Sequence, residues 1–142
     1  MELRSLEDTL SFSKNISKVI KAGDVIFLYG EIGTGKTTFV RFLINHLEVE
    51  NKVKKSDILS PTFNIVYDYQ VGKIKIYHYD LYRIKNIKEL EELDFFENIN
   101  KSITIIEWPE LLIDLPFKKK HYLINLDLYS ENKRAINIKY FE

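Results

Sequence analysis

The chain has 142 residues, of which 45% are hydrophobic and 30% charged, so we expect one globular domain spanning residues 1–142. Its 21 basic residues balance its 21 acidic residues, which argues against a protein that grips nucleic acid by itself. Cysteine is absent, which excludes disulfides and thiolate zinc sites. No apolar run is long enough for a membrane span and no signal-peptide core follows Met1, so the sequence predicts a cytoplasmic protein without a membrane partner.

The first predicted element is an amphipathic helix. Ser5 is followed three residues later by Asp8, as in a capping box. Gly23 suits the position just after a helix end. The apolar face of this helix is expected to consist of Leu6, Leu10, Ile16, Val19 and Ile20.

Residues 30–37 read Gly-Glu-Ile-Gly-Thr-Gly-Lys-Thr, which matches the P-loop pattern G-x-x-x-x-G-K-T. The apolar run 25–29 predicts a buried strand before it, and apolar residues at helical spacing predict a helix from Lys36 to about Leu47. Glycines let consecutive N–H groups point at one anion, and the helix N-terminus adds its positive dipole end. This context argues against an ordinary glycine-rich turn. The candidate nucleotide-binding residues are Gly30, Gly33, Thr34, Gly35, Lys36, Thr37 and Thr38.

Within this motif, Lys36 is expected to reach the β- and γ-phosphates, and the Thr37 hydroxyl to ligate Mg²⁺. Thr9, on the preceding helix, is either a contact on the base side of the nucleotide or an exposed helix residue.

A polar stretch, residues 48–59, predicts an exposed loop that leads into Ser60-Pro61-Thr62-Phe63. Pro61 fixes its own φ and favours an extended Ser60, which places the Thr62 hydroxyl on a defined turn. Thr62 is then either a switch residue near the γ-phosphate and Mg²⁺ or part of a plain Ser-Pro turn.

Residues 65–69 and 74–79 predict paired strands joined at residues 70–73. Asp80 follows the second strand, and a carboxylate at a strand tip beside a P-loop is a candidate Mg²⁺ ligand; the alternative is a surface acid. His78 is expected to be a strand histidine without a functional role. Farther on, Asn86 and Glu89 indicate a capped helix whose acidic face is either solvated or a surface for a basic partner.

The run 103–106 contains four β-branched residues and predicts a central strand buried on both faces. Glu107 follows it, where the strand beside a P-loop strand carries the acid that orients Mg²⁺ or the attacking water. Asp80 and Asp127 compete for that role. Asn125 and Asp127 share one face of a strand that we expect at the sheet edge, paired with residues 134–140, so Asp127 is rejected and Glu107 is favoured over Asp80.

Four segments together resemble the TsaE (YjeE) family of small bacterial P-loop ATPases: residues 30–37, 60–63, 78–83 and 107–110. The resemblance implies catalytic roles for Lys36, Asp80 and Glu107, and an Mg²⁺ site at Thr37, Asp80 and Glu107. It also implies that Thr62 is a switch residue and that Arg134 lies near the nucleotide. From the residues alone, simple exposure of Arg134 is favoured over a phosphate or base contact. The chain departs from the family at Leu93-Asp94-Phe95, where relatives usually carry a glycine.

The family resemblance implies an ATP- and Mg²⁺-dependent accessory protein for threonylcarbamoylation of the tRNA adenosine beside the anticodon. Its expected partners are TsaB-like and TsaD-like proteins, with tRNA reached indirectly through that complex. The expected fold is α/β, a P-loop NTPase-like three-layer sandwich with a mostly parallel sheet and a C-terminal antiparallel hairpin. Two alternatives remain open: a small-molecule kinase, which would need a lid, and a nucleotide-gated binding module without relevant hydrolysis.

Overall fold

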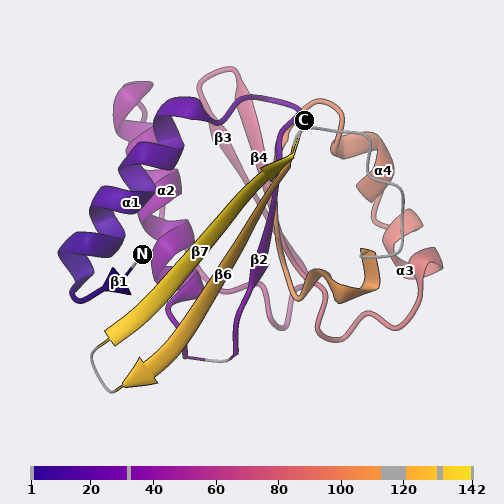
Figure 1. The fold of residues 1–142 in the computed structure, drawn as a ribbon. Helices are drawn as coiled ribbons and strands as arrows, with labels where there is room; N and C mark the ends of the chain where they lie inside the picture. The colour runs from indigo at the N-terminus through magenta and orange to yellow at the C-terminus, as the bar shows by residue number, and fades with distance from the viewer. Residues whose placement is uncertain (1, 32, 113–120, 131–132, 142) are drawn as a thin grey trace.

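The computed structural model describes residues 2–31, 33–112, 121–130 and 133–141 (Figure 1). In this part of the chain a single sheet has the strand order β1-β7-β6-β2-β5-β4-β3. The central strands β6, β2, β5 and β4 run parallel, and β1, β7 and β3 add antiparallel edges. The predicted mostly parallel sheet with a C-terminal hairpin is thereby confirmed. The strands are β1 (Glu2–Leu3), β2 (Val25–Tyr29), β3 (Val66–Val71), β4 (Ile74–Asp80), β5 (Ile103–Glu107), β6 (His121–Ser130) and β7 (Lys133–Phe141).

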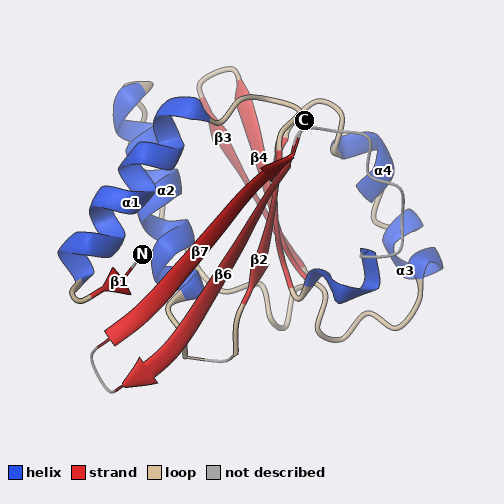
Figure 2. Ribbon diagram, viewed as in Figure 1, coloured by secondary structure: helices blue, strands red, loops and turns tan. Residues whose placement is uncertain are grey.

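Helices cover both faces of the sheet, which gives the predicted three layers (Figure 2). On one face lie α1 (Leu6–Val19) and α2 (Lys36–Glu50), and on the other lie α3 (Ile87–Glu91), α4 (Phe95–Asn98) and the 3₁₀ turn η1 (Pro109–Leu112). Successive residues of the central strands point to opposite faces of the sheet and form two separate hydrophobic cores, one on each face. Ile26 and Ile105 pack on the α1/α2 side, whereas Phe27 and Ile106 pack on the α3/α4 side. No helix in the described ranges is long and apolar enough to cross a membrane.

The N-terminal helix has the predicted start but a different buried face. Ser5 caps α1 by accepting a hydrogen bond from the Asp8 N–H. Leu6 is 64% exposed, and Leu10 and Val19 are exposed as well, so the predicted face was largely wrong. The buried face consists of Thr9, Phe12, Ser13, Ile16 and Ser17. Small hydroxyl residues suit this face because α1 packs directly against α2, where Phe12 contacts Phe39 and the Ser13 hydroxyl reaches backbone carbonyls.

The helix also ends earlier than predicted. Its last helical residue is Val19, and Ile20 is the C-cap. Gly23 lies beyond the cap with φ +93°, and its N–H donates to the Ser102 carbonyl. The glycine therefore serves the turn that enters β2, where a left-handed conformation is needed, and not the helix end itself.

Residues 48–59 were predicted to form an exposed loop, and this was wrong for Glu48. Helix α2 continues to Glu50, and the Glu48 side chain is buried. Its carboxylate accepts hydrogen bonds from the Asn45 amide, the Ser56 N–H and the Ser56 hydroxyl, the last at 2.6 Å. Glu48 thus accepts hydrogen bonds from the loop that follows α2 and holds that loop against the helix. These hydrogen bonds offset the cost of burying the carboxylate.

The capping box of Asn86 and Glu89 is confirmed, but the helix it starts is broken. Asp94 adopts a left-handed conformation with φ +56° between α3 and α4. Glycine adopts that conformation most readily, so Asp94 holds a backbone conformation that is uncommon for a residue with a side chain. The break turns Phe95 into the core beside Tyr79.

Strand β6 was predicted to be an edge strand, which is wrong. It pairs in parallel with β2 and antiparallel with β7. Its polar residues have a different cause, because β2 ends at Tyr29, opposite Asn125, and β6 runs on past it. Asn125, opposite the end of β2, and Asp127, beyond it, are both exposed. Asp127 is not among the residues that line the site cavity.

Candidate functional site

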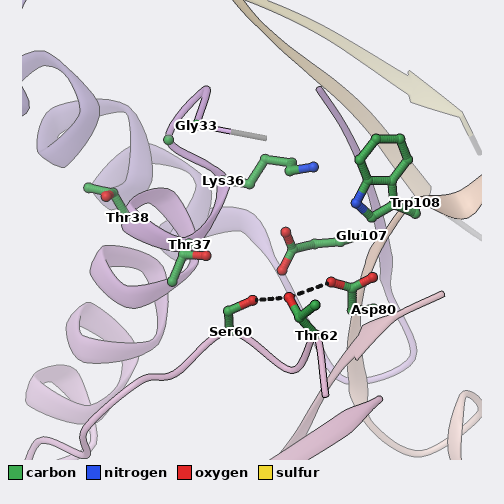
Figure 3. Close-up of a pocket in the computed structure, with 10 residues that line it drawn as sticks. Gly33, Lys36, Thr37, Thr38, Ser60, Thr62, Asp80, Glu107 and Trp108 are labelled. Carbon is green, nitrogen blue, oxygen red and sulfur yellow. Dashed lines mark hydrogen bonds between the residues drawn. The ribbon is translucent and has the colours of Figure 1, made fainter. Parts of the chain in front are cut away.

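A cavity of about 320 Å³ lies where the carboxyl ends of β4 and β5 meet the N-terminus of α2 (Figure 3). In open α/β sheets this edge is the usual place for a ligand. The residues that line it come from four segments far apart in the sequence, and they include most of the predicted site. They are Gly33, Gly35, Lys36, Thr37, Thr38, Ser60, Thr62, Asp80, Glu107 and Trp108.

The loop from Gly30 to Gly35 has a backbone that depends on glycine. Gly30, Gly33 and Gly35 have φ values of +145°, +85° and +100°, which L-residues rarely adopt. Gly30 does not line the cavity, and its role is close packing: a Cβ there would lie 2.6 Å from the Leu126 carbonyl oxygen. Ile32 lies outside the described residues.

Helix α2 presents an open N-terminus to the cavity. Its N-cap is Gly35, and no side chain caps its first N–H groups. Those donors and the positive end of the helix dipole favour an anion. The loop and helix therefore have the geometry of a phosphate-binding site.

Lys36 places its charge in the same cavity. The side chain is buried, and its amine donates a hydrogen bond to the Gly30 carbonyl. The amine also lies 4.3 Å from the centroid of the Trp108 ring. Across the described ranges no carboxylate lies within ion-pair distance of it. A buried ammonium held by a carbonyl and an aromatic face keeps its charge available for an anionic ligand.

Two buried carboxylates lie side by side at the strand ends. Asp80 ends β4, Glu107 ends β5, and the two are register partners across the parallel pair. They are 4% and 3% exposed. Asp80 accepts hydrogen bonds from the Thr62 hydroxyl, at 3.1 Å, and from the Tyr82 N–H, at 3.0 Å. The structure thus brings both candidate acids together in one cavity.

The segment that contains Thr62 is fastened to the end of β4. The Ser60 and Thr62 hydroxyls lie 2.7 Å apart (Figure 3). The Asp80 N–H donates to the Ile65 carbonyl. Ile65 has a φ of +70°, an outlier for a β-branched residue. Strain of this kind persists only where the surroundings fix it, and it is common at ligand sites.

The donor set fits Mg²⁺ only together with a phosphate ligand. Within the described ranges no group of three or more His, Cys, Asp or Glu residues could hold a metal ion. Mg²⁺ in nucleotide sites is bound by one or two carboxylates, a hydroxyl and substrate phosphates, so a cage of protein ligands is not required. Thr37, Asp80 and Glu107 all line the cavity and supply that set.

A family model described as "Threonylcarbamoyl adenosine biosynthesis protein TsaE" matches residues 3–136. The chain belongs to the TsaE family. The TsaE protein of Rickettsia felis is 38% identical over 96% of this chain and 77% of its own length, and that of Aquifex aeolicus is 37% identical over 96% and 92%. Among solved structures, Bacillus subtilis YdiB is similar with a TM-score of 0.73 at 24% identity, covering 97% of this chain and 82% of that one, which supports the fold.

Besides Gly30, two further candidates for this TsaE-family site, Thr34 and Thr9, do not line the main cavity. Thr34 lines a neighbouring apolar groove, which shares Gly35 and Thr38 with the main cavity. Thr9 also lines that groove, which places it beside the P-loop. The other groove residues are Leu3, Leu6 and Leu126. Arg134 lies on β7, where its backbone is the register partner of Leu3 on β1 and of Leu128 on β6. Its side chain lies outside the described part of the structure.

His78 was expected to be a strand histidine without a functional role, and it does lie on β4. Its contact with Glu107 was not anticipated from the sequence: the side chain is fully buried with Nε2 2.6 Å from Oε2 of Glu107. The available signal was the alternation along β4, which puts His78 on the same face as Asp80. That signal becomes informative only once β4 is known to lie beside β5.

Proposed function

We propose that residues 1–142 act as a single ATPase domain that binds ATP with Mg²⁺ in this cavity and hydrolyses it. The observation that carries the proposal is the meeting of the P-loop amine and helix N-terminus with two buried carboxylates and a threonine hydroxyl. The relatives named above are tRNA threonylcarbamoyladenosine biosynthesis proteins. Their names support a role in that tRNA modification. We propose that the chain exerts this role in the cytoplasm, on a complex of TsaB-like and TsaD-like proteins.

The phosphates of ATP would be held by the loop and by the start of α2. The N–H groups of residues 33–37 and the Lys36 amine supply positive potential at the place where negative charge grows during phosphoryl transfer. Thr37, with Asp80 or Glu107, would hold Mg²⁺, which when bound neutralises charge on the phosphate oxygens. The nucleoside is expected to extend along the apolar groove that contains Thr9.

Hydrolysis requires a water in line with the terminal phosphate, so that its oxygen bonds to phosphorus as the bond to the β-phosphate oxygen breaks. Glu107 is the better placed acid for that water. Both oxygens of Asp80 already accept a hydrogen bond, from Thr62 and from Tyr82. Glu107 is bonded through Oε2 alone, which leaves Oε1 to accept a proton from water.

A partner that binds the tRNA would explain why this chain has no net positive charge. Equal numbers of acidic and basic residues provide no long-range attraction to tRNA. We expect slow hydrolysis by the isolated chain, a faster rate in the TsaB–TsaD complex, and contact with tRNA only through that complex.

The deciding experiment is ATP hydrolysis by the purified chain, alone and with TsaB and TsaD from the same organism. We expect a low basal rate that rises when both partners are added, and that disappears in Lys36→Ala. Lys75→Ala is the matched control, because Lys75 lies on β4 away from the cavity and pairs with Asp68. A rate indifferent to the partners would contradict the pathway. Phosphate transfer to a small acceptor would instead identify a kinase, and nucleotide binding without turnover a nucleotide-gated module.

A further inference from the structure

The contact between His78 and Glu107 is the most completely buried polar pair of the site. His78 is 0% exposed and Glu107 3%. They lie on neighbouring parallel strands, where His78 pairs with Ile105 and Glu107 with Asp80. Both side chains are therefore on the α1/α2 face of the sheet, the face on which the P-loop helix packs.

The hydrogen-bond partners of the ring assign its tautomer. Within the described residues, Nδ1 of His78 is buried and has no hydrogen-bond partner. Nε2 lies 2.6 Å from Oε2 of Glu107, and an ionised carboxylate can only accept. Nε2 therefore carries the proton and donates it to Glu107. A second proton on Nδ1 would create a buried donor without an acceptor, which is costly.

This bond fixes the orientation of the Glu107 carboxylate. A glutamate has three side-chain torsions, and its carboxylate at a strand end can rotate unless something fixes it. Trp108, the next residue, has a left-handed φ of +54°, so the chain turns sharply away just after Glu107. The bond to Oε2 selects one orientation and leaves Oε1 as the oxygen without a protein partner in the described structure.

We propose that His78 is a positioning residue for turnover, which fixes the Glu107 carboxylate through Nε2–H so that Oε1 faces the reacting phosphate. This inference rests on the proposed ATPase function. His78 itself does not line the cavity and would not touch the nucleotide. Because it acts only through Glu107, its loss should lower kcat and leave nucleotide affinity unchanged.

The bond itself can be tested without any nucleotide. Long-range ¹H–¹⁵N correlation spectra of the full chain resolve the imidazole nitrogens of its three histidines, and His78→Gln assigns the His78 signals. We expect a protonated Nε2, an unprotonated Nδ1 and a Nε2 proton at low field. Glu107→Gln weakens the acceptor and should move that proton upfield, whereas Glu110→Gln, which changes an exposed acid, should not.

The functional half of the test compares three variants in ATP turnover, nucleotide Kd and thermal unfolding. His78→Phe keeps a planar aromatic ring, although a larger one, but has no donor. We expect kcat to fall about 10- to 100-fold, as for other residues that orient a catalytic ligand. The Kd should stay within about twofold, since the phosphate site of residues 33–37 is intact. His78→Gln offers a new N–H donor and should recover part of kcat. Thr104→Val is the matched control, a buried isosteric change on β5 that should leave kcat unchanged.

The outcomes separate this inference from the proposed function. Wild-type turnover in a folded His78→Phe, or a His78 signal unaffected by Glu107→Gln, would overturn the positioning role while leaving the ATPase in place. An equal loss of kcat in Thr104→Val would also overturn it, because the effect would then be general to the core. If the unmodified chain binds but never hydrolyses ATP, with or without TsaB and TsaD, the ATPase proposal fails and the turnover role of His78 falls with it.

Discussion

The Thr62 hydroxyl donates a 3.1 Å hydrogen bond to Oδ2 of Asp80, which joins the loop after α2 to the acid at the end of β4. The Asp80 N–H reinforces the junction by donating to the Ile65 carbonyl. A ligand that contacts Asp80 therefore also acts on the loop. Two elements 18 residues apart in sequence are in this way coupled at the cavity, as a switch segment requires.

Thr62→Val should uncouple the loop from the acid. Valine has the same shape but cannot donate, so Asp80 loses one of its two side-chain hydrogen bonds. We expect ATP turnover to fall about 10- to 100-fold, with a smaller effect on nucleotide affinity. Thr62→Ser keeps the hydroxyl and is the matched control, so its turnover should stay close to that of the unmodified chain. Equal rates for the valine and serine variants would contradict the coupling.

Glu107→Gln should bind nucleotide but lose hydrolysis. The amide cannot accept a proton from water, and loss of a positioned acid–base group typically lowers the rate about 10²- to 10⁴-fold. The comparison variant is Asp80→Asn, for which we expect weaker Mg²⁺-dependent binding because its loss also loosens Thr62. Single-turnover hydrolysis and equilibrium nucleotide binding measured on both variants distinguish the two roles. The opposite pattern would assign the catalytic acid to Asp80.

Lys36→Ala should abolish nucleotide binding without unfolding the chain, and Trp108 should report it. Trp108 is the only tryptophan, and the Lys36 amine lies over its ring. A cation–π contact of this kind contributes only about 0.5–2 kcal/mol, so phosphates can draw the amine away. We expect ATP with Mg²⁺ to change the tryptophan emission of the unmodified chain and to leave that of Lys36→Ala unchanged. A saturable emission change in Lys36→Ala would contradict the assignment of the phosphate clamp.

Features that depend on adjacent residues could be predicted from the sequence. Strand β2 is a continuous apolar run, β5 begins with four β-branched residues, and the P-loop is a contiguous motif, so each was predicted with nearly the observed bounds. Asp80 and Glu107, the two acids that line the cavity, could be named as candidates for the same reason, because each lies at the end of a recognisable strand.

Features that depend on which elements become neighbours could not be predicted. The buried face of α1 is set by its close packing on α2, which favours Thr9 and Ser13 over the larger Leu6 and Leu10. The role of His78 depends on β4 lying beside β5, a pairing that no local pattern specifies. The break at Asp94 could not be predicted either. The helical sequence pattern continues through this residue, but tertiary packing holds it in a left-handed conformation.

The folded chain should lose stability at alkaline pH through Tyr79. Burial raises the pKa of Tyr79 to about 12 from 10.0, with a partly opposing hydrogen bond from Asn98. The pKa of Tyr79 is higher in the folded chain than in the unfolded chain. The contribution of its neutral hydroxyl to the free energy of unfolding is therefore fully present below pH 10 and is lost as the pH rises towards 12. Tyr79→Phe should therefore lose less unfolding free energy between pH 8 and pH 11 than the unmodified chain. Urea unfolding at the two pH values measures this, with the exposed Tyr82→Phe as control.

Substitution by alanine at Gly30 should mainly lower the stability of the fold, whereas at Gly33 it should mainly lower nucleotide affinity. At Gly30 a Cβ would lie 2.6 Å from the Leu126 carbonyl oxygen and 2.7 Å from the Thr34 hydroxyl, and Leu126 belongs to strand β6 and cannot yield cheaply. Overpacking of this kind costs about 1–3 kcal/mol, so Gly30→Ala should lower the free energy of unfolding by at least that amount. At Gly33 a Cβ would meet nothing within 4 Å, and only the left-handed φ of +85° opposes it.

Gly33 lines the cavity, so an added methyl group would enter the space that the phosphates need. Gly33→Ala should therefore lose less unfolding free energy than Gly30→Ala. The ratio of lost nucleotide-binding free energy to lost unfolding free energy should be larger for Gly33→Ala. Urea unfolding and nucleotide binding measured on both variants give the two ratios. Equal ratios would mean that the loop acts only as a structural turn, because a phosphate site must distinguish a methyl group that faces the ligand from one that faces β6.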